Sequence, residues 1–84
     1  MTREEIKAQL TPIFQTVFKN PALVVQDQLV AADVPGWDSL SNVAMIAEVE
    51  KHFKIRVKLR EILKMKNVGD LVDCIDRSVA SRAG

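Results

Sequence analysis

The sequence predicts an all-α fold: a small four-helix bundle in which three main helices run up, down and down and a short third helix crosses them. Apolar residues recur at three- and four-residue spacing in three separate stretches, the periodicity of a helix with one buried face. Stretches typical of strands are scarce. The chain has 84 residues, 48% of them hydrophobic, which suits one core, so we expect a single domain over residues 1–84.

The first helix is expected to begin after Thr2, a suitable N-cap, and to end by Asn20 and Pro21, because a residue before proline is pushed out of the helical region. Pro12 lies inside this segment and lacks the N–H that would bond the carbonyl four residues earlier. We therefore expect a kink there, or a new helix start with Thr11 as its cap. The apolar stripe of this helix consists of Ile6, Leu10, Ile13, Phe14, Val17 and Phe18.

Residues 21–38 form an irregular connection, which is followed by a second helix over Ser39–Phe53. A connection this long is expected to pack its own apolar side chains against the bundle, with Trp37 as the anchor. In the second helix Val43 is expected in the core, whereas Leu40 suits core and surface equally well. The full stripe consists of Leu40, Val43, Ile46, Val49 and Phe53.

The last third of the chain is expected to hold a connector, a short helix and a final helix. In the connector, Ile55 and Val57 alternate with charged residues and should point inward. The short helix is predicted over Leu59–Met65, and Asn67 should cap the final helix, with Asp70 at its third position as in a capping box. The side chains expected to be buried are Leu59, Ile62 and Leu63 from the short helix, and Leu71, Cys74 or Ile75, and Val79 from the final one.

Charge is divided unevenly along the chain. Residues 1–50 carry three Lys or Arg against seven Asp or Glu, whereas residues 51–66 carry seven against one. Such a basic block attracts acidic surfaces over a distance, so we expect a partner to present an acidic area opposite the third helix; a merely solvated face is an equal alternative. Nucleic acid is not an expected partner, because the block's one aromatic residue, Phe53, is assigned to the core and the pI is only about 7.9.

Composition excludes several classes of protein. A single cysteine allows no internal disulfide framework and no cysteine-based zinc cluster, and no uncharged stretch is long enough to span a bilayer. The N-terminus is polar and has no apolar signal region. We therefore expect a cytoplasmic protein with no metal and no membrane contact, and a monomer.

The most informative triplet is Asp38-Ser39-Leu40. Ser39 follows a loop and begins a helix, with Asp38 as N-cap, so its hydroxyl should project into solvent beside N–H groups and a helix dipole that favour an anion. Ser39 is thus a candidate for carrying a phosphodiester; the alternative is that it only caps the helix.

A hydrolase would pair Ser39 with His52, but thirteen residues of helix separate the two by about 20 Å, which excludes a dyad. Cys74 is expected to be buried rather than reactive.

The run Gly36–Ser41 and the landmarks that follow it closely resemble the acyl carrier protein family. In that family Asp-Ser-Leu opens the second helix, a Phe closes it, as Phe53 does here, and an alternating Ile-x-Ile/Val stretch follows, as at residues 55–57. Residues 67–71 are similar to the family's fourth-helix opening. The resemblance extends from the first helix to about Val79 and needs no insertion.

The resemblance implies that Ser39 carries a phosphopantetheine arm, attached by a phosphopantetheinyl transferase that uses coenzyme A and is helped by Asp38. Acyl intermediates would ride on the arm as thioesters and be presented to acyl-loading and acyl-processing enzymes. The protein would then be a non-catalytic carrier, since the reactive chemistry belongs to the cofactor. The rival hypothesis is a small helical protein-interaction module in which Ser39 is only a helix cap.

Two departures from the family's pattern affect these expectations. The second helix, usually rich in acidic residues, keeps only Glu48 and Glu50, which favours a specialised fatty-acid or polyketide-type pathway over housekeeping fatty-acid synthesis. Lys54 stands where the family often has glycine, so it must adopt a left-handed conformation at a modest cost, or the turn is built differently. The identity of the acyl cargo cannot be read from the chain.

Overall fold

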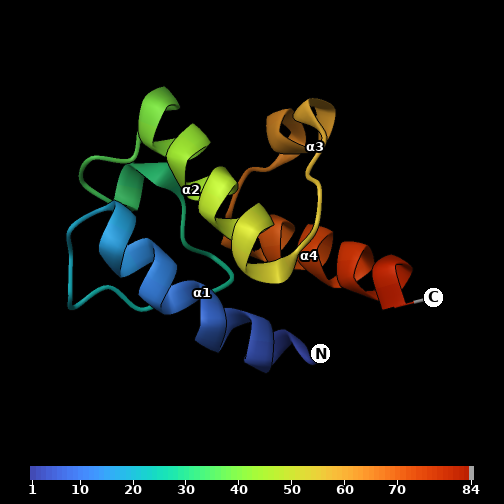
Figure 1. Ribbon diagram of the computed structural model, residues 1–84. Helices are drawn as coiled ribbons and strands as arrows, with labels where there is room; N and C mark the ends of the chain where they lie inside the picture. Colours follow the sequence, from blue (N-terminus) through green and yellow to red (C-terminus); the bar gives the residue numbers. More distant parts are fainter. Residues whose placement is uncertain (84) are drawn as a thin grey trace.

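The computed structural model describes residues 1–83, and within them it contains four α-helices and no strand. The elements are α1 (Arg3–Val17), a 3-10 turn η1 (Ala31–Asp33), α2 (Ser39–Phe53), α3 (Leu59–Lys64) and α4 (Val68–Ala83). Figure 1 shows α2 and α4 running in one direction and α1 in the other, with α3 standing apart at the top of the view. The predicted all-α bundle is confirmed. None of its helices, as far as residue 83, is long and apolar enough to cross a membrane.

α1 is a single helix that continues through Pro12. Thr2 caps it as predicted: its hydroxyl accepts from the Glu5 N–H at 3.1 Å, and the Glu5 carboxylate accepts from the Thr2 N–H at 2.8 Å. The predicted alternative of a new start at Thr11 is wrong, because the Thr11 hydroxyl donates to the Lys7 carbonyl at 3.0 Å instead of capping a helix. Ile6, Leu10 and Phe14 are fully buried along its inner side.

The ends of α1 and α2 share one device, a lysine in the left-handed backbone region. Lys19 has φ 52° and Lys54 has φ 57°. The N–H of the next residue then donates to a carbonyl five residues earlier, at 3.0 Å after Lys19 and 3.1 Å after Lys54, which satisfies carbonyls left open at a helix end. The expected left-handed conformation of Lys54 is therefore confirmed, and α1 ends at Val17, before the predicted limit of Asn20 and Pro21.

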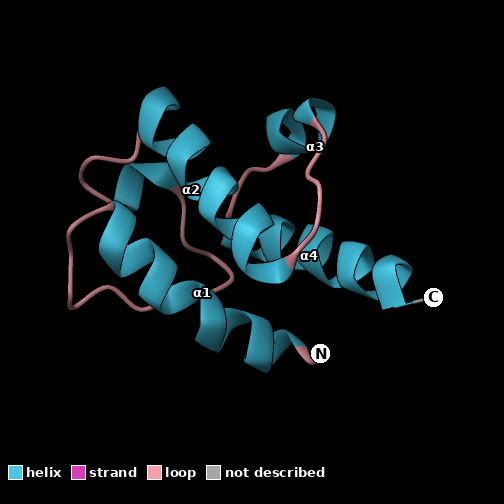
Figure 2. Cartoon of the chain, viewed as in Figure 1, coloured by secondary structure: helices cyan, strands magenta, loops and turns pink. Residues whose placement is uncertain are grey.

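The long connection between α1 and α2, which Figure 2 draws as loop except at η1, is fastened to α1 by polar side chains. The Gln15 amide donates to the Leu23 carbonyl at 3.0 Å, and the Val25 N–H donates to the Thr11 hydroxyl at 3.3 Å. These bonds hold Leu23 and Val25 in buried positions, and Val34, further along the connection, is buried as well. The prediction that the connection packs its apolar side chains against the bundle is confirmed.

The same connection supplies partners for the first turn of α4. The N–H groups of Val68 and Gly69 donate to the carbonyls of Leu29 and Asp27, both at 2.8 Å, so two donors that a helix start leaves open are satisfied by the loop. A Cβ on Gly69 would lie 3.1 Å from the Asp27 carbonyl oxygen. Glycine at this position therefore lets the loop backbone approach the helix closely.

Asn67 caps α4 as predicted. Its side-chain oxygen accepts from the Asp70 N–H at 2.9 Å. The Asp70 carboxylate reaches back to the Lys66 N–H at 2.9 Å, one residue before the N-cap. The capping box is thus present in a variant form. Behind this cap α4 buries Val68, Leu71, Val72, Cys74, Ile75 and Val79.

The core lies where α1, α4 and the second half of α2 meet. The connector residues Ile55 and Val57 point into it, as predicted. Three residues of the predicted apolar stripes are half-buried rather than buried: Ile13, Val17 and Ile62. Buried as predicted are Ile6, Leu10, Phe14, Ile46, Val49, Phe53, Leu71 and Ile75.

Four apolar side chains of α2 and α3 lie outside this core. Leu40 is 84% exposed and Val43 67% in α2, and Leu59 is 69% exposed and Leu63 76% in α3. The core positions predicted for Val43, Leu59 and Leu63 are therefore wrong. The buried side of α2 is centred on Met45, Ile46, Val49 and Phe53. A three-residue step falls about 60° short of a full turn, so Val43 and then Leu40 lie progressively further round from that side. A helix as short as α3 turns only its Ile62 side inward.

Candidate functional site

Ser39 is the first residue of α2, and its side chain is exposed. Its hydroxyl makes no hydrogen bond with any group in residues 1–83. Ser41, two residues further along, differs: its hydroxyl donates to the Gly36 carbonyl at 2.7 Å and accepts from the Asp38 N–H at 2.8 Å. Of the two serines at this helix start, Ser39 therefore has the hydroxyl that is free to react.

Asp38 caps α2 as predicted, and this changes what the helix start offers an anion. Its carboxylate accepts from the N–H groups of Leu40 and Ser41, at 3.0 and 2.9 Å. The expectation that N–H groups without an acceptor lie beside Ser39 is thus wrong for the N–H groups of Leu40 and Ser41. What remains for a phosphodiester is the N–H of Ser39 itself, which has no acceptor within the described chain, and the positive end of the helix dipole.

The cap also lowers the pKa of Asp38 below its ordinary value, chiefly through the hydrogen bond from the Ser41 N–H. A carboxyl whose pKa is lower folded than unfolded stabilises the fold above its ordinary pKa, and that contribution is lost as the pH falls. An asparagine at position 38 can also cap the helix but does not titrate. We therefore expect wild type to lose free energy of unfolding relative to Asp38→Asn when the pH drops from about 7 to about 3. Urea unfolding at both pH values measures it, and a difference independent of pH would contradict the capping role.

A tight turn before the helix sets the approach to Ser39. The Trp37 N–H donates to the Val34 carbonyl at 3.1 Å, with Pro35 and Gly36 between them. Gly36 has φ 89°, and proline followed by a left-handed glycine is the pattern of a type II turn. A side chain at Gly36 would be strained by this backbone even though nothing lies within 4 Å. The turn directs Trp37 back toward the bundle.

Trp37 anchors this turn, as predicted. Its ring packs edge-on against Phe14 at 5.4 Å between centroids and obliquely against Phe18 at 5.3 Å. Its indole N–H donates to the Asn42 side-chain oxygen at 3.0 Å. The segment before Ser39 is therefore fixed to both α1 and α2. Sequence reasoning missed Asn42, because nothing in the pattern distinguishes it from any other polar residue in the first turns of a helix.

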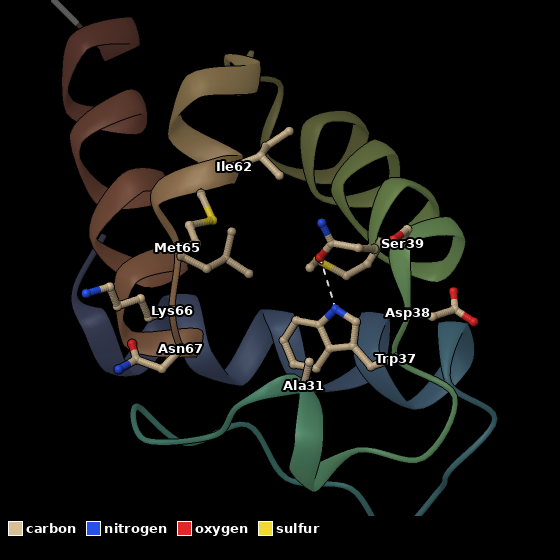
Figure 3. A pocket seen from close by; sticks show the side chains of 11 residues that line it. Ala31, Trp37, Asp38, Ser39, Ile62, Met65, Lys66 and Asn67 are labelled. Carbon is tan, nitrogen blue, oxygen red and sulfur yellow. Dashed lines mark hydrogen bonds between the residues drawn. The ribbon is translucent and has the colours of Figure 1, made fainter.

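A cleft of about 340 Å³ begins at Ser39 and runs between α2 and α3. In Figure 3, Ser39 and Asp38 lie at one end, Ile62 projects from α3 toward α2, and the Trp37 ring lies below. Its apolar walls include Met45, Met65 and Leu71 as well as Ile62. The free hydroxyl thus lies at the mouth of a largely apolar cleft.

The other candidate residues stay apart from Ser39. His52 lies at the far end of α2 and bonds the Gln9 side chain of α1 at 2.8 Å. Ser39 and His52 therefore cannot form a dyad. Cys74 is buried, as predicted, and burial raises the pKa of its thiol, with a further contribution from Glu61. Within residues 1–83, no group of three His, Cys, Asp or Glu side chains is placed to hold a metal ion.

Comparison with known proteins agrees with this geometry. Residues 8–75 match the family described as "Phosphopantetheine attachment site". The chain is 33% identical over 81 residues to an acyl carrier protein of Acidothermus cellulolyticus, covering 96% of each protein.

Solved structures of similar proteins share the fold. A holo acyl carrier protein from Geobacter metallireducens superimposes with a TM-score of 0.86 at 42% identity, covering 90% of this chain and 87% of that one. An acyl carrier protein from Thermotoga maritima gives a TM-score of 0.82 at 21% identity, covering 95% and 93%. The latter likeness is one of fold alone.

Proposed function

The chain belongs to the acyl carrier protein family, whose members carry covalently attached phosphopantetheine, and from this premise we propose that Ser39 is the residue that bears the arm. When bound, the arm supplies a thiol that holds acyl groups as thioesters. The protein's own part is to present and orient the attachment point and to be recognised by other enzymes.

The observation that carries this proposal is the difference between the two serines at the start of α2. A transferase needs a hydroxyl that it can reach and that is not already bonded. Ser39 is exposed and unbonded within residues 1–83, whereas the Ser41 hydroxyl bonds both Gly36 and Asp38. A residue that served only as a cap would have its hydroxyl bonded to backbone N–H groups, and here Asp38 makes those bonds instead.

The surroundings of Ser39 fit a long attached group. The attachment point is held rigidly, because the Trp37 ring is packed against Phe14 and Phe18 directly before the helix. On the other side the cleft presents apolar walls close to the hydroxyl. A group attached at Ser39 can therefore either extend into solvent or lie along those walls.

We further propose that the carrier serves a specialised fatty-acid or polyketide-type pathway. Between Ser39 and Ala47 the helix carries no charged residue, and its first acidic side chain is Glu48. The partners would be a phosphopantetheinyl transferase and enzymes that load and process acyl groups, and the protein itself would act without catalysis.

The test is modification of the purified protein with coenzyme A and a broad-specificity phosphopantetheinyl transferase. We expect the intact mass to rise by one phosphopantetheine, and fragmentation to locate the addition within the peptide that contains Ser39. An unchanged mass would favour the alternative, an interaction module in which Ser39 belongs only to a helix start.

A further inference from the structure

α3 carries an exposed apolar pair beside an exposed basic pair. Leu59 and Leu63 are 69% and 76% exposed, and residues four apart lie on one face of a helix. Arg60 and Lys64 have the same spacing and occupy the neighbouring face, where both are exposed. A six-residue helix therefore displays two leucines next to two cations.

The basic side chains of segment 51–66, which includes α3, have no ion-pair partners in the described part of the chain. The one acidic residue of segment 51–66, Glu61, is paired with Arg77 of α4 at 3.3 Å. Figure 3 shows the Lys66 amine directed away from the cleft. With Glu61 included, the segment has a net charge of +6. Its unpaired basic residues are Lys51, Lys54, Arg56, Lys58, Arg60, Lys64 and Lys66.

This surface adjoins the cleft at Ser39. Ile62 forms part of the cleft wall, and Leu59 and Leu63 are its neighbours in the helix, three residues before it and one after. We therefore expect an enzyme that approaches the Ser39 hydroxyl from the α3 side to meet the two leucines and the cations beside them. Apolar surface left exposed next to a functional group is typical of an interaction site.

We propose that α3 is a docking face for an acyl-processing enzyme whose own surface has an apolar centre ringed by carboxylates; this rests on the proposed carrier function. The leucines would be covered by the apolar centre, while the cations set the orientation and speed the encounter. An anionic membrane would complement the same charges, but an interfacial helix needs a longer apolar face than two leucines provide. A protein partner is therefore the occupant that the surface favours.

The probe for this proposal is a synthetic amphipathic helical peptide with leucines on one face and glutamates on the other. We expect it to shift the amide NMR signals of residues 56–66, and binding to weaken as salt is raised. Lys64→Glu should weaken binding about tenfold, and Leu59→Ser with Leu63→Ser should weaken it comparably. Lys19→Glu is the matched control: it changes the net charge equally at the far end of α1 and should leave binding unchanged.

Several results would overturn the proposal. One is that the acidic peptide fails to bind the protein, and another is that a peptide with lysines in place of the glutamates binds it equally well. The third such result is that the amide NMR signals that shift lie outside α3 and its flanks. Binding of phosphatidylglycerol vesicles in place of the acidic peptide would instead identify a membrane surface. Wild-type protein that gains the arm but does not bind the peptide would overturn docking alone, so failure of docking is distinguishable from failure of arm attachment.

Discussion

Replacing Ser39 with alanine is expected to abolish phosphopantetheine attachment completely, and with it all loading of acyl groups. The substitution removes the one hydroxyl at the start of α2 that is exposed and without a hydrogen bond in residues 1–83. Because that hydroxyl bonds nothing, its loss should change the free energy of unfolding by less than about 0.5 kcal/mol. Intact-mass measurement after incubation with transferase and coenzyme A gives the first result, and urea unfolding gives the second.

Ser41→Ala is the matched control, since it removes a hydroxyl two residues away in the same turn. It leaves the Gly36 carbonyl and the Asp38 N–H without their partner, so it should cost about 1 kcal/mol of stability while the arm is still attached. The two variants should thus have opposite effects. A protein that still gains the arm in Ser39→Ala, or loses it in Ser41→Ala, would show that the attachment residue has been assigned wrongly.

Phe14→Ala is expected to remove a large part of the stability of the fold. The Phe14 side chain is fully buried and contacts Phe18 at 5.5 Å and Trp37 at 5.4 Å between ring centroids. Truncating a buried phenylalanine costs about 3–5 kcal/mol, which compares with a total of about 5–15 kcal/mol for an ordinary domain. Urea unfolding followed by circular dichroism measures the loss, and the fluorescence of Trp37, the protein's one tryptophan, reports the loosened anchor.

The control for this variant is Thr16→Ala, an exposed position on the same helix. It should stay within about 0.5 kcal/mol of wild type. The comparison tests whether one aromatic cluster holds the turn before Ser39 to α1. If Phe14→Ala costs less than about 1 kcal/mol, the cluster is not a principal part of the core.

Local chemistry made several elements predictable from the sequence. Both ends of α2 agree with the prediction over Ser39–Phe53, because an aspartate cap at one end and the last residue of an apolar stripe at the other are short-range signals. Asn67 was equally readable as a cap. Trp37 was predictable as an anchor, although the side chains it contacts were not, since Phe14 and Phe18 are about twenty residues away in the chain.

The errors concern which apolar side chains are covered. Apolar spacing shows which side chains lie near one another on a helix, but not which side the rest of the fold covers: Met45 and Ile46 are buried, whereas Val43 lies beside Ile46 and is exposed. Leu59 and Leu63 were misassigned for the same reason, since α3 has too few residues to be enclosed on several sides. Their exposure, with the cations beside them, is what defines the proposed docking face.

The order of residues alone determined the caps at Thr2, Asp38 and Asn67, both ends of α2 and which hydroxyl stands first in α2, because caps, turns and apolar periodicity act over a few neighbours. Packing between distant segments decided the rest. The Asp27 and Leu29 carbonyls meet the start of α4, and α3 stands opposite α2 to form the cleft. Such contacts depend on how far each helix extends past its neighbours, which spacing along one segment does not specify.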